Sequence, residues 1–196
     1  MPVDCPFKIP KLTRDEFMER DDIVMRCAYA SQNRLGRLCD ERVYENDLAA
    51  RLRAEGMPSV MTQIPITVTH GPFTKVYRLD LVADAAVYEL KTVLHLTNEH
   101  DAQVFNYAML LDVLCIKLLN FRNAKIEGKL RLAPITWGKR YGFQIDASRW
   151  TPMSPRCQSV KQHLSDVLTD LGAFLAARLY EEALACLAPA LETKLN

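Results

Sequence analysis

The stretch RLDLVADAAVYELK, residues 78–91, decides the fold of this chain. Two runs rich in Val, Leu and Tyr, which favour β-strands, flank an Asp-Ala dipeptide at 84–85. A two-residue turn at that dipeptide makes the stretch a β-hairpin in which Asp80 lies opposite Glu89. Because side chains alternate between the two faces of a strand, Glu89 and Lys91 share a face, with Asp80 beside them. The hairpin therefore predicts a cluster of charged side chains on apolar strands.

Two carboxylates that face each other repel, so the pair requires a cation nearby. Lys91 and Arg78, which the same register places opposite each other, can supply it, and the cluster is then a buried ion pair. A bound divalent metal supplies the charge more fully, and oxygen ligands favour Mg²⁺ or Mn²⁺ over a softer metal. The hairpin by itself leaves both interpretations open.

The segments around the hairpin predict an α-β-β-β-α-β order. Helices are expected over residues 13–30, 34–56 and 97–112, and strands over 61–70, 75–83, 86–94 and 113–121. Thr13 and Glu16 have the spacing of a capping box, and Gly56 is a suitable helix stop. Pro65 indicates that the first strand lies at an edge or contains a bulge. Beyond residue 123 we expect one or two further strands, a loop at 151–156 and one long helix over 159–195, either continuous or broken before Pro189.

The helix over 97–112 carries polar side chains on an otherwise apolar segment. Glu99, Gln103 and Tyr107 are spaced four residues apart and therefore share one face. Its other residues are largely apolar and suit a buried core. For Gln103 taken alone, a solvated helix face is the simpler explanation.

Taken together, these motifs resemble the PD-(D/E)XK nuclease superfamily, and within it the GxxExxY family. The resemblance rests on Asp80 in one strand and on ELK, residues 89–91, in the next. QVFNY, residues 103–107, matches the family's Gln-x-x-x-Tyr element, and LLNF, residues 118–121, is similar to its strand end. The elements follow in the family's order.

The family's GxxExxY signature corresponds here to LGRLCDERVYENDL, with its Glu at Glu41 and its Tyr at Tyr44. The chain departs from the signature at its Gly, because Leu38 holds that position and a glycine stands two residues earlier, at Gly36. The resemblance implies an α/β fold with a restriction-endonuclease-like core, in which helices flank a mixed sheet. We expect a single domain over 1–196, with the nuclease-like core at 31–122 and an extension at 123–196 that includes a long C-terminal helix.

The resemblance implies a metal-dependent nuclease that hydrolyses phosphodiester bonds in nucleic acid, with DNA favoured over RNA. Asp80 and Glu89 would hold Mg²⁺, or Mn²⁺ as the alternative, together with the backbone carbonyl of Leu90 and, directly or through water, Glu41. Lys91 would position the attacking water or stabilise charge that develops on the phosphate.

The remaining predicted roles are supporting ones. By resemblance, Gln103 and Tyr107 would support Lys91 and the substrate backbone. We expect Arg78 to pair with Asp80.

Two other functions fit the same residues. One is a non-catalytic or partner-dependent nucleic-acid-binding module with the nuclease fold. The other is a structural protein in which Asp80, Glu89 and Lys91 form a buried salt bridge, and it predicts that Asp80→Ala unfolds the chain. An intact set of Glu41, Asp80, Glu89 and Lys91 favours the enzyme.

The composition bears on three further questions: cysteine metal sites, membrane contact and binding of a polyanion. The six Cys include no CxxC pair, which favours reduced thiols over a zinc or iron–sulfur site. No apolar run approaches the roughly 20 residues of a membrane span, and no signal-like segment is present, so a cytoplasmic location without membrane contact is expected. The net charge is only +1, but ten of the twelve charged residues between positions 115 and 161 are basic, which suits either a polyanion or a solvated face.

The C-terminal helix carries an apolar stripe. Its members are Leu164, Val167, Leu168, Leu171, Phe174, Leu175 and Leu179. Packing on the core is the simpler explanation of the stripe. A contact with a protein partner or a second copy of the chain is the alternative.

Overall fold

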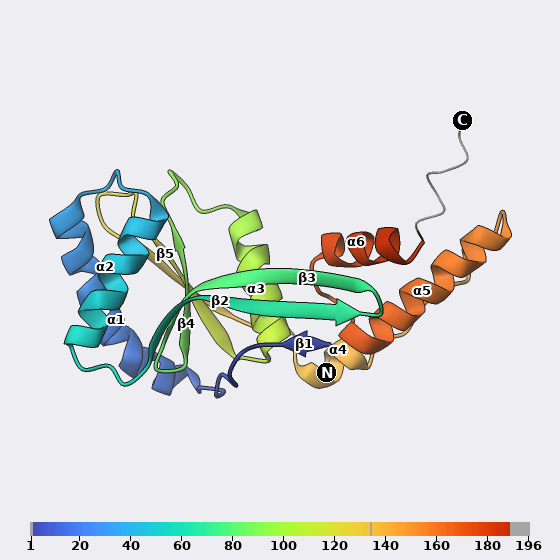
Figure 1. The fold of residues 1–196 in the computed structure, drawn as a ribbon, viewed down its shortest axis with the longest axis horizontal. Helices are drawn as coiled ribbons and strands as arrows, with labels where there is room; N and C mark the ends of the chain where they lie inside the picture. Colours follow the sequence, from blue (N-terminus) through green and yellow to red (C-terminus); the bar gives the residue numbers. More distant parts are fainter. Residues whose placement is uncertain (1, 134, 189–196) are drawn as a thin grey trace. The chain divides into compact units, whose positions relative to one another are not determined.

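The computed structural model describes residues 2–133 and 135–188. The elements follow one another as β1 (Val3–Asp4), α1 (Arg14–Leu35), α2 (Glu41–Ala54), β2 (Val60–His70), β3 (Phe73–Ala83), β4 (Ala86–Lys91), α3 (Asn98–Leu111), β5 (Cys115–Asn120), β6 (Glu127–Leu132), α4 (Trp137–Tyr141), α5 (Pro155–Leu171) and α6 (Ala177–Leu187) (Figure 1). From α2 to β5 this is the predicted α-β-β-β-α-β order. None of the helices in the described parts of the chain has the length and apolar character that a membrane crossing requires.

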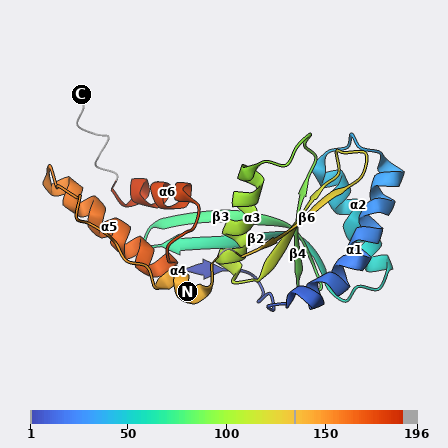
Figure 2. The same cartoon turned by 180° about the vertical axis from the view of Figure 1, so that it is seen from behind.

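The strands form one six-stranded sheet in the order β1-β2-β3-β4-β5-β6. β4 and β5 are parallel, whereas β3 with β4 and β5 with β6 are antiparallel, so the sheet is mixed. β6 forms the edge beyond β5, and the rear view labels it (Figure 2). Helices flank the sheet, and this confirms the predicted restriction-endonuclease-like α/β fold.

The β3–β4 hairpin has the predicted register. Val82 pairs with Val87, and the neighbouring pairs on either side follow the same alignment. Asp84 and Ala85 form the turn, with φ values of 46° and 69°. Positive φ at both central residues is typical of the tight hairpin turn whose twist matches that of the strands. Asp80 and Glu89 are the next residues on their strands after the last aligned pair, Leu81 with Tyr88, and Asp80 lies close enough to raise the pKa of Glu89.

Side-chain alternation along β4 separates the core from the charged residues. Tyr88 and Leu90 are fully buried in the core that α1 and α2 cover. Glu89 and Lys91 therefore point to the opposite face, the side on which α3 lies. The parallel strand β5 next to them is buried along its whole length, as its apolar run predicts.

The segment predicted as one helix over 34–56 is divided in the structure. α1 begins at the predicted Thr13 capping box but continues to Leu35. Gly36, with a φ of 78°, ends it, and its N–H donates to the carbonyl of Gln32. α2 starts only at Glu41, so the intervening residues form a loop. The expected helix start at residue 34 is therefore wrong, because the glycine terminates α1 there.

The chain divides into two compact units. The larger unit comprises residues 5–66 and 77–134, and the smaller unit comprises residues 1–4, 67–76 and 135–196. Strands β2 and β3 contribute residues to both units. The expectation of a single domain over 1–196 stays a prediction, as do the bounds of a core at 31–122.

The long C-terminal helix is broken within the smaller unit. α5 begins at Pro155, after its cap at Ser154, and ends before Gly172, which has a φ of 75°. Arg140, which is buried, donates to the Leu171 carbonyl, and its own carbonyl accepts from Ala173 at 2.9 Å. These contacts fix the break between α5 and α6, so the prediction of one continuous helix is wrong. The part of that helix predicted beyond residue 188 lies outside the described residues.

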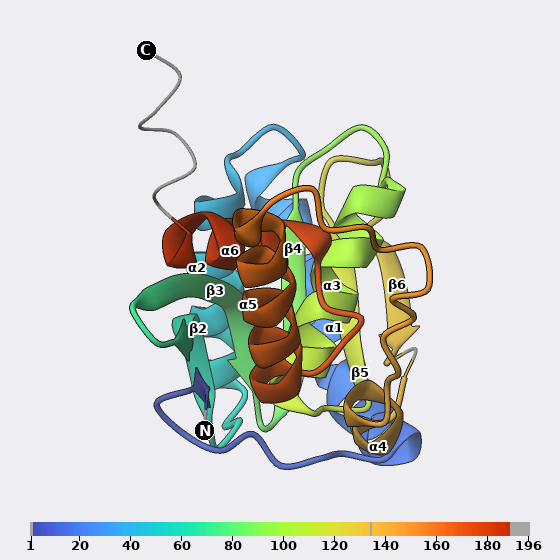
Figure 3. The same ribbon diagram turned by 90° about the vertical axis from the view of Figure 1, so that its right-hand side faces the viewer.

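The apolar stripe on these helices is mostly internal to the smaller unit, where α6 packs against α5 (Figure 3). Val167, Leu171, Leu175 and Leu179 are buried, whereas Phe174 is 56% exposed. Packing therefore accounts for most of the stripe. A partner or homo-oligomer contact through these helices stays a prediction.

Candidate active site

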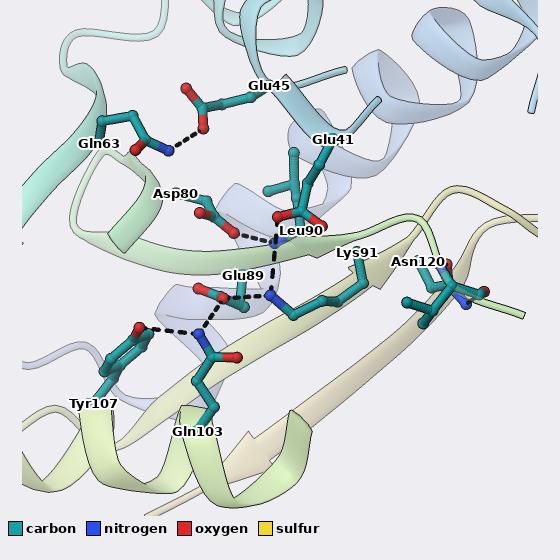
Figure 4. A network of polar contacts seen from close by, with 11 residues as sticks. Glu41, Glu45, Gln63, Asp80, Glu89, Leu90, Lys91, Gln103, Tyr107 and Asn120 are labelled. Carbon is teal, nitrogen blue, oxygen red and sulfur yellow. Dashed lines mark hydrogen bonds and ion pairs between the residues drawn. The ribbon is translucent and has the colours of Figure 1, made fainter. Parts of the chain in front are cut away.

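The charged residues of the hairpin meet in the larger unit, at the end of β4. The Nζ atom of Lys91 lies 2.6 Å from Oε1 of Glu89 and 4.0 Å from Oε1 of Glu41, which the first turn of α2 supplies. Asp80 points to the same region from β3, where its Oδ2 accepts the Leu90 backbone N–H at 2.8 Å. Figure 4 shows these side chains converging from two strands and a helix (Figure 4).

The helix α3 contributes a second set of polar contacts. Gln103 Nε2 donates to Oε1 of Glu89 at 2.7 Å and to the Tyr107 hydroxyl at 2.9 Å. Gln103 and Tyr107 were expected to support Lys91. In the structure Gln103 contacts Glu89, so the same carboxylate oxygen receives both the amide and the Lys91 ammonium. The structure thus brings all six predicted site side chains into one region.

Two neighbouring residues take structural positions. Tyr44 is fully buried, stacks on Phe121 at 4.5 Å and donates to the Gly36 carbonyl at 2.6 Å, which fixes the loop before Glu41. Arg78 is exposed, and among the described residues no ion pair joins it to Asp80. The expected pairing of Arg78 with Asp80 is wrong, because Asp80 turns inward to the Leu90 amide.

The electrostatics of the site are dominated by buried negative charge. Glu89 is 2% exposed, and burial together with the nearby Asp80 raises its pKa to about 8. Burial also raises the pKa values of Asp80 and Glu41, against the opposing effect of Lys91. For Lys91, burial favours the neutral amine, but Glu89, Glu41 and Asp80 outweigh it and raise the pKa. The site therefore holds a protonated Lys91 among carboxyl groups whose pKa values are raised. One lysine supplies too little positive charge for all of them to ionise readily.

A comparison with protein-family models gives one decisive match. The model of the PD-(D/E)XK nuclease superfamily matches residues 19–132, well over half of the chain. The chain belongs to the PD-(D/E)XK nuclease superfamily. The match spans α1 to β6 and so includes every site residue described above. No curated protein and no solved structure matches the chain. Assignment to the GxxExxY family stays a prediction.

Nucleases of the PD-(D/E)XK superfamily typically use divalent metals. Within the described parts of the chain, no group of three or more His, Cys, Asp or Glu side chains is arranged to hold a metal ion. Hydrogen-bond donors of the protein contact the carboxylates instead: Lys91 donates to Glu89, and the Leu90 amide donates to Asp80. The oxygen atoms that accept these hydrogen bonds suit a hard cation, because they belong to carboxylates. Oε2 of Glu89 is buried and has no hydrogen-bond partner among the described residues, so a cation would satisfy an oxygen that the protein leaves unpaired.

The site contains polar residues that the sequence reasoning did not select. Asn120 is fully buried at the end of β5, in register with Lys91. Its Nδ2 donates to the Val93 carbonyl at 2.8 Å and its Oδ1 accepts the Val93 N–H at 3.1 Å, which fixes the backbone just after Lys91. A polar residue at the end of an apolar strand was the available signal.

Glu45 and Gln63 form a second contact beside the site, with Gln63 Nε2 donating to Oε2 of Glu45 at 2.5 Å. Glu45 was detectable from its position one helical turn after Glu41. Gln63 carried no comparable signal.

Proposed function

We propose that this chain is a metal-dependent nuclease that hydrolyses phosphodiester bonds in nucleic acid, with DNA favoured over RNA. The observation that carries the proposal is the gathering of Asp80, Glu89 and Lys91 in one region, where Lys91 contacts Oε1 of Glu89 and the buried Oε2 of Glu89 has no hydrogen-bond partner among the described residues. Membership of the superfamily supports it, because that superfamily generally comprises metal-dependent nucleases.

The cation is proposed to be Mg²⁺, with Mn²⁺ as the alternative. Asp80 and Glu89 would hold it, assisted by the Leu90 carbonyl and, directly or through water, by Glu41. When bound, such a cation would supply the charge that polarises the phosphate and lowers the pKa of a bound water. Its charge also favours the ionised form of Glu89, whose pKa is raised by burial.

The protein's own groups position the reactants. Lys91 keeps its proton at the working pH, so its ammonium orients the water or offsets negative charge that develops on the phosphate. Gln103 holds Glu89 in place through the oxygen that also contacts Lys91, and Tyr107 fixes the Gln103 amide. Tyr107 stays a neutral phenol, because burial and the nearby Glu89 raise its pKa.

A cleavage assay tests the proposal. The purified chain is mixed with labelled single- and double-stranded DNA and RNA in Mg²⁺, Mn²⁺ or EDTA. Lys91→Ala is the test variant, and Lys8→Ala, at an exposed lysine, is the matched control. We expect metal-dependent cutting that falls by at least about a hundredfold in Lys91→Ala and is unchanged in Lys8→Ala.

The alternative is a nucleic-acid-binding module without turnover. It predicts a folded chain that binds metal and nucleic acid but cuts none of the four substrates. Equal cutting by Lys91→Ala and the wild type would exclude the proposed role of Lys91.

A further inference from the structure

The buried amide of Asn120 continues the contact between β4 and β5 beyond their backbone pairing. The two strands are in register up to Lys91 and Asn120, and the Phe121 N–H donates to the Lys91 carbonyl at 2.8 Å. Past that bond, Asn120 Oδ1 accepts the Val93 N–H at 3.1 Å, and Nδ2 donates to the Val93 carbonyl at 2.8 Å. The side chain thus binds both backbone groups of Val93, as a further strand residue would.

Side-chain hydrogen bonds fix the backbone on both sides of Lys91. Before it, the Leu90 N–H donates to a carboxylate oxygen of the site at 2.8 Å, and after it Asn120 holds Val93. Lys91 is the last residue of β4, and the ends of elements open most easily. Its ammonium, 2.6 Å from Glu89, stands at the end of a long flexible side chain. The place of the ammonium therefore depends on where the backbone lies.

The end of β5 is a rigid support for this contact. Phe121 is fully buried and stacks on Tyr44, with 4.5 Å between the ring centroids. The Phe121 carbonyl accepts from Gln32 Nε2 at 2.8 Å. Oδ1 of Asn120 also accepts the Arg122 N–H at 3.2 Å, so the amide is held by the chain that follows it. Asn120 therefore attaches the end of β4 to a fixed strand, and Figure 4 shows it beside Lys91.

Stability of the fold alone explains this amide poorly. Asn120 is fully buried, and a buried amide is unfavourable unless it is hydrogen-bonded. Val93 is partly exposed, so water can satisfy its backbone groups without a side chain. An apolar residue at position 120 would extend the core around Phe121. What the amide provides instead is a defined path for the chain directly after Lys91.

We propose that Asn120 is a positioning residue of the active site: by holding both backbone groups of Val93, it fixes the end of β4 from which the Lys91 ammonium reaches Glu89. Asn120 contacts neither substrate nor cation in this role and acts through Lys91. The inference rests on the proposed nuclease function and adds a residue to it.

A double-mutant cycle tests whether Asn120 acts through Lys91. The wild type, Asn120→Ala, Lys91→Ala and the double variant are compared as full chains, in Mn²⁺, on whichever of the four labelled substrates the wild type cuts fastest. The measurements are kcat, KM, Mn²⁺ affinity by calorimetry and melting temperature. Asn120→Ser is a second variant, because serine keeps an oxygen but is too short to bind both groups of Val93.

Ile116→Val is the matched control. Ile116 is fully buried in the same strand, four residues before Asn120, so its truncation lowers the melting temperature away from the end of β4. Each variant is assayed well below its own melting temperature.

The proposal predicts that kcat falls about 10- to 100-fold in Asn120→Ala, while KM and Mn²⁺ affinity stay within about twofold of the wild type. In the Lys91→Ala background the same substitution should change kcat by less than about twofold, because the group that it positions is already gone. Asn120→Ser should lose activity in the same way, and Ile116→Val should keep the wild-type kcat.

A residue that only stabilises the fold predicts an equal fall of kcat in both backgrounds, and that result overturns the inference. It is also overturned by a wild-type kcat in Asn120→Ala, by a loss of Mn²⁺ affinity in place of kcat, or by the failure of both the alanine and the serine variant to fold.

The failure of the proposed function has a different signature. If the wild type cuts none of the four substrates, the nuclease function fails and the inference fails with it. If the wild type and Lys91→Ala cut equally, Lys91 has no role through which Asn120 could act. If the wild type cuts and Lys91→Ala is impaired, the function stands, and the cycle alone judges Asn120.

Discussion

Glu89 shares one of its oxygens between Lys91 and Gln103 and buries the other without a partner among the described residues. A carboxyl group in this position retains its proton to higher pH than the same group in an unfolded chain, because burial and Asp80 raise its pKa to about 8 from 4.5. Over that interval the folded state binds more protons than the unfolded state, so stability falls as the pH rises. Below the unfolded pKa the stabilising contribution is fully present.

The first prediction concerns this pH dependence. In EDTA, the free energy of unfolding of the wild type should decrease between about pH 4.5 and 8, by an amount on the order of a few kcal/mol. Glu89→Gln, which cannot ionise, should show a clearly smaller decrease. Urea unfolding at several pH values measures both slopes. Equal slopes for the two proteins would show that Glu89 does not titrate in this interval.

Two substitutions of Asp80 can distinguish an effect on folding from an effect on function. Asp80→Ala would leave the buried Leu90 N–H without its acceptor, at a cost of about 1–3 kcal/mol. Asp80→Asn keeps an oxygen for that N–H and removes a negative charge next to Glu89. We therefore expect Asp80→Asn to melt at or slightly above the wild-type temperature and to lose cleavage.

Thermal unfolding and the cleavage assay test this second prediction, with Asp22→Asn at an exposed position as control. A chain that unfolds on Asp80→Asn would instead support the structural salt bridge as the role of the cluster.

Among the elements, the β3–β4 turn sets the register of the site and is itself strained. Ala85 has a φ of 69°, where its Cβ is unfavourable. The turn is braced from outside, since the Asp84 N–H donates to the Ser59 carbonyl at 2.7 Å and Arg20 Nε donates to the Asp84 carbonyl at 2.9 Å. These contacts explain how an Asp-Ala pair forms a turn that usually contains glycine.

The third prediction follows from this strain. Ala85→Gly should raise the free energy of unfolding by about 0.5–1 kcal/mol, because glycine adopts a positive φ without penalty and only part of the gain is lost to its freedom in the unfolded chain. Ala86→Gly, one residue later and fully buried in β4, should destabilise by about 1 kcal/mol. Urea unfolding compares the two variants. A loss of stability in Ala85→Gly would mean that the Ala85 side chain makes contacts that outweigh the strain.

At the scale of the whole molecule, the features that could be predicted from the sequence are those that depend on a local pattern of residues. The hairpin register followed from strand alternation and a two-residue turn, and with it the meeting of Asp80 and Glu89. Strand β5 could also be predicted, because burial on both faces requires a continuous apolar run. The start of α1 could be predicted because a capping box has a fixed residue spacing.

What the sequence did not show depends on contacts between distant residues. Gln63 contacts Glu45 beside the site from a position in β2 where its backbone is left-handed, and no periodic pattern predicts such a conformation. The break at Gly172 follows from Arg140, which lies 32 positions earlier and occupies the space that a side chain at 172 would need, with its Cγ 2.6 Å from the position of a Cβ. The apolar stripe favoured a continuous helix, and this tertiary contact overrode it.

The fourth prediction concerns charge over the whole chain. The net charge of +1 provides little long-range attraction to a polyanion, and part of the basic stretch is already neutralised. Lys117 pairs with the buried Asp21, and Arg131 forms two hydrogen bonds with Asp101. The active-site carboxylates would repel a phosphate that approaches them. Binding of nucleic acid at the site should therefore depend on a cation that neutralises Asp80 and its neighbours.

Fluorescence anisotropy with a labelled DNA duplex at one fixed ionic strength tests this dependence. We expect weak binding by the wild type in EDTA and at least about tenfold tighter binding in Ca²⁺, which takes the same oxygen ligands, with the duplex checked for cleavage on a gel. Asp80→Asn should bind more tightly than the wild type in EDTA, because one repelling charge is gone, and should respond little to Ca²⁺. Tight binding by both proteins in EDTA would place the nucleic-acid contact on a surface away from the carboxylates. The site would then require a different role for Asp80.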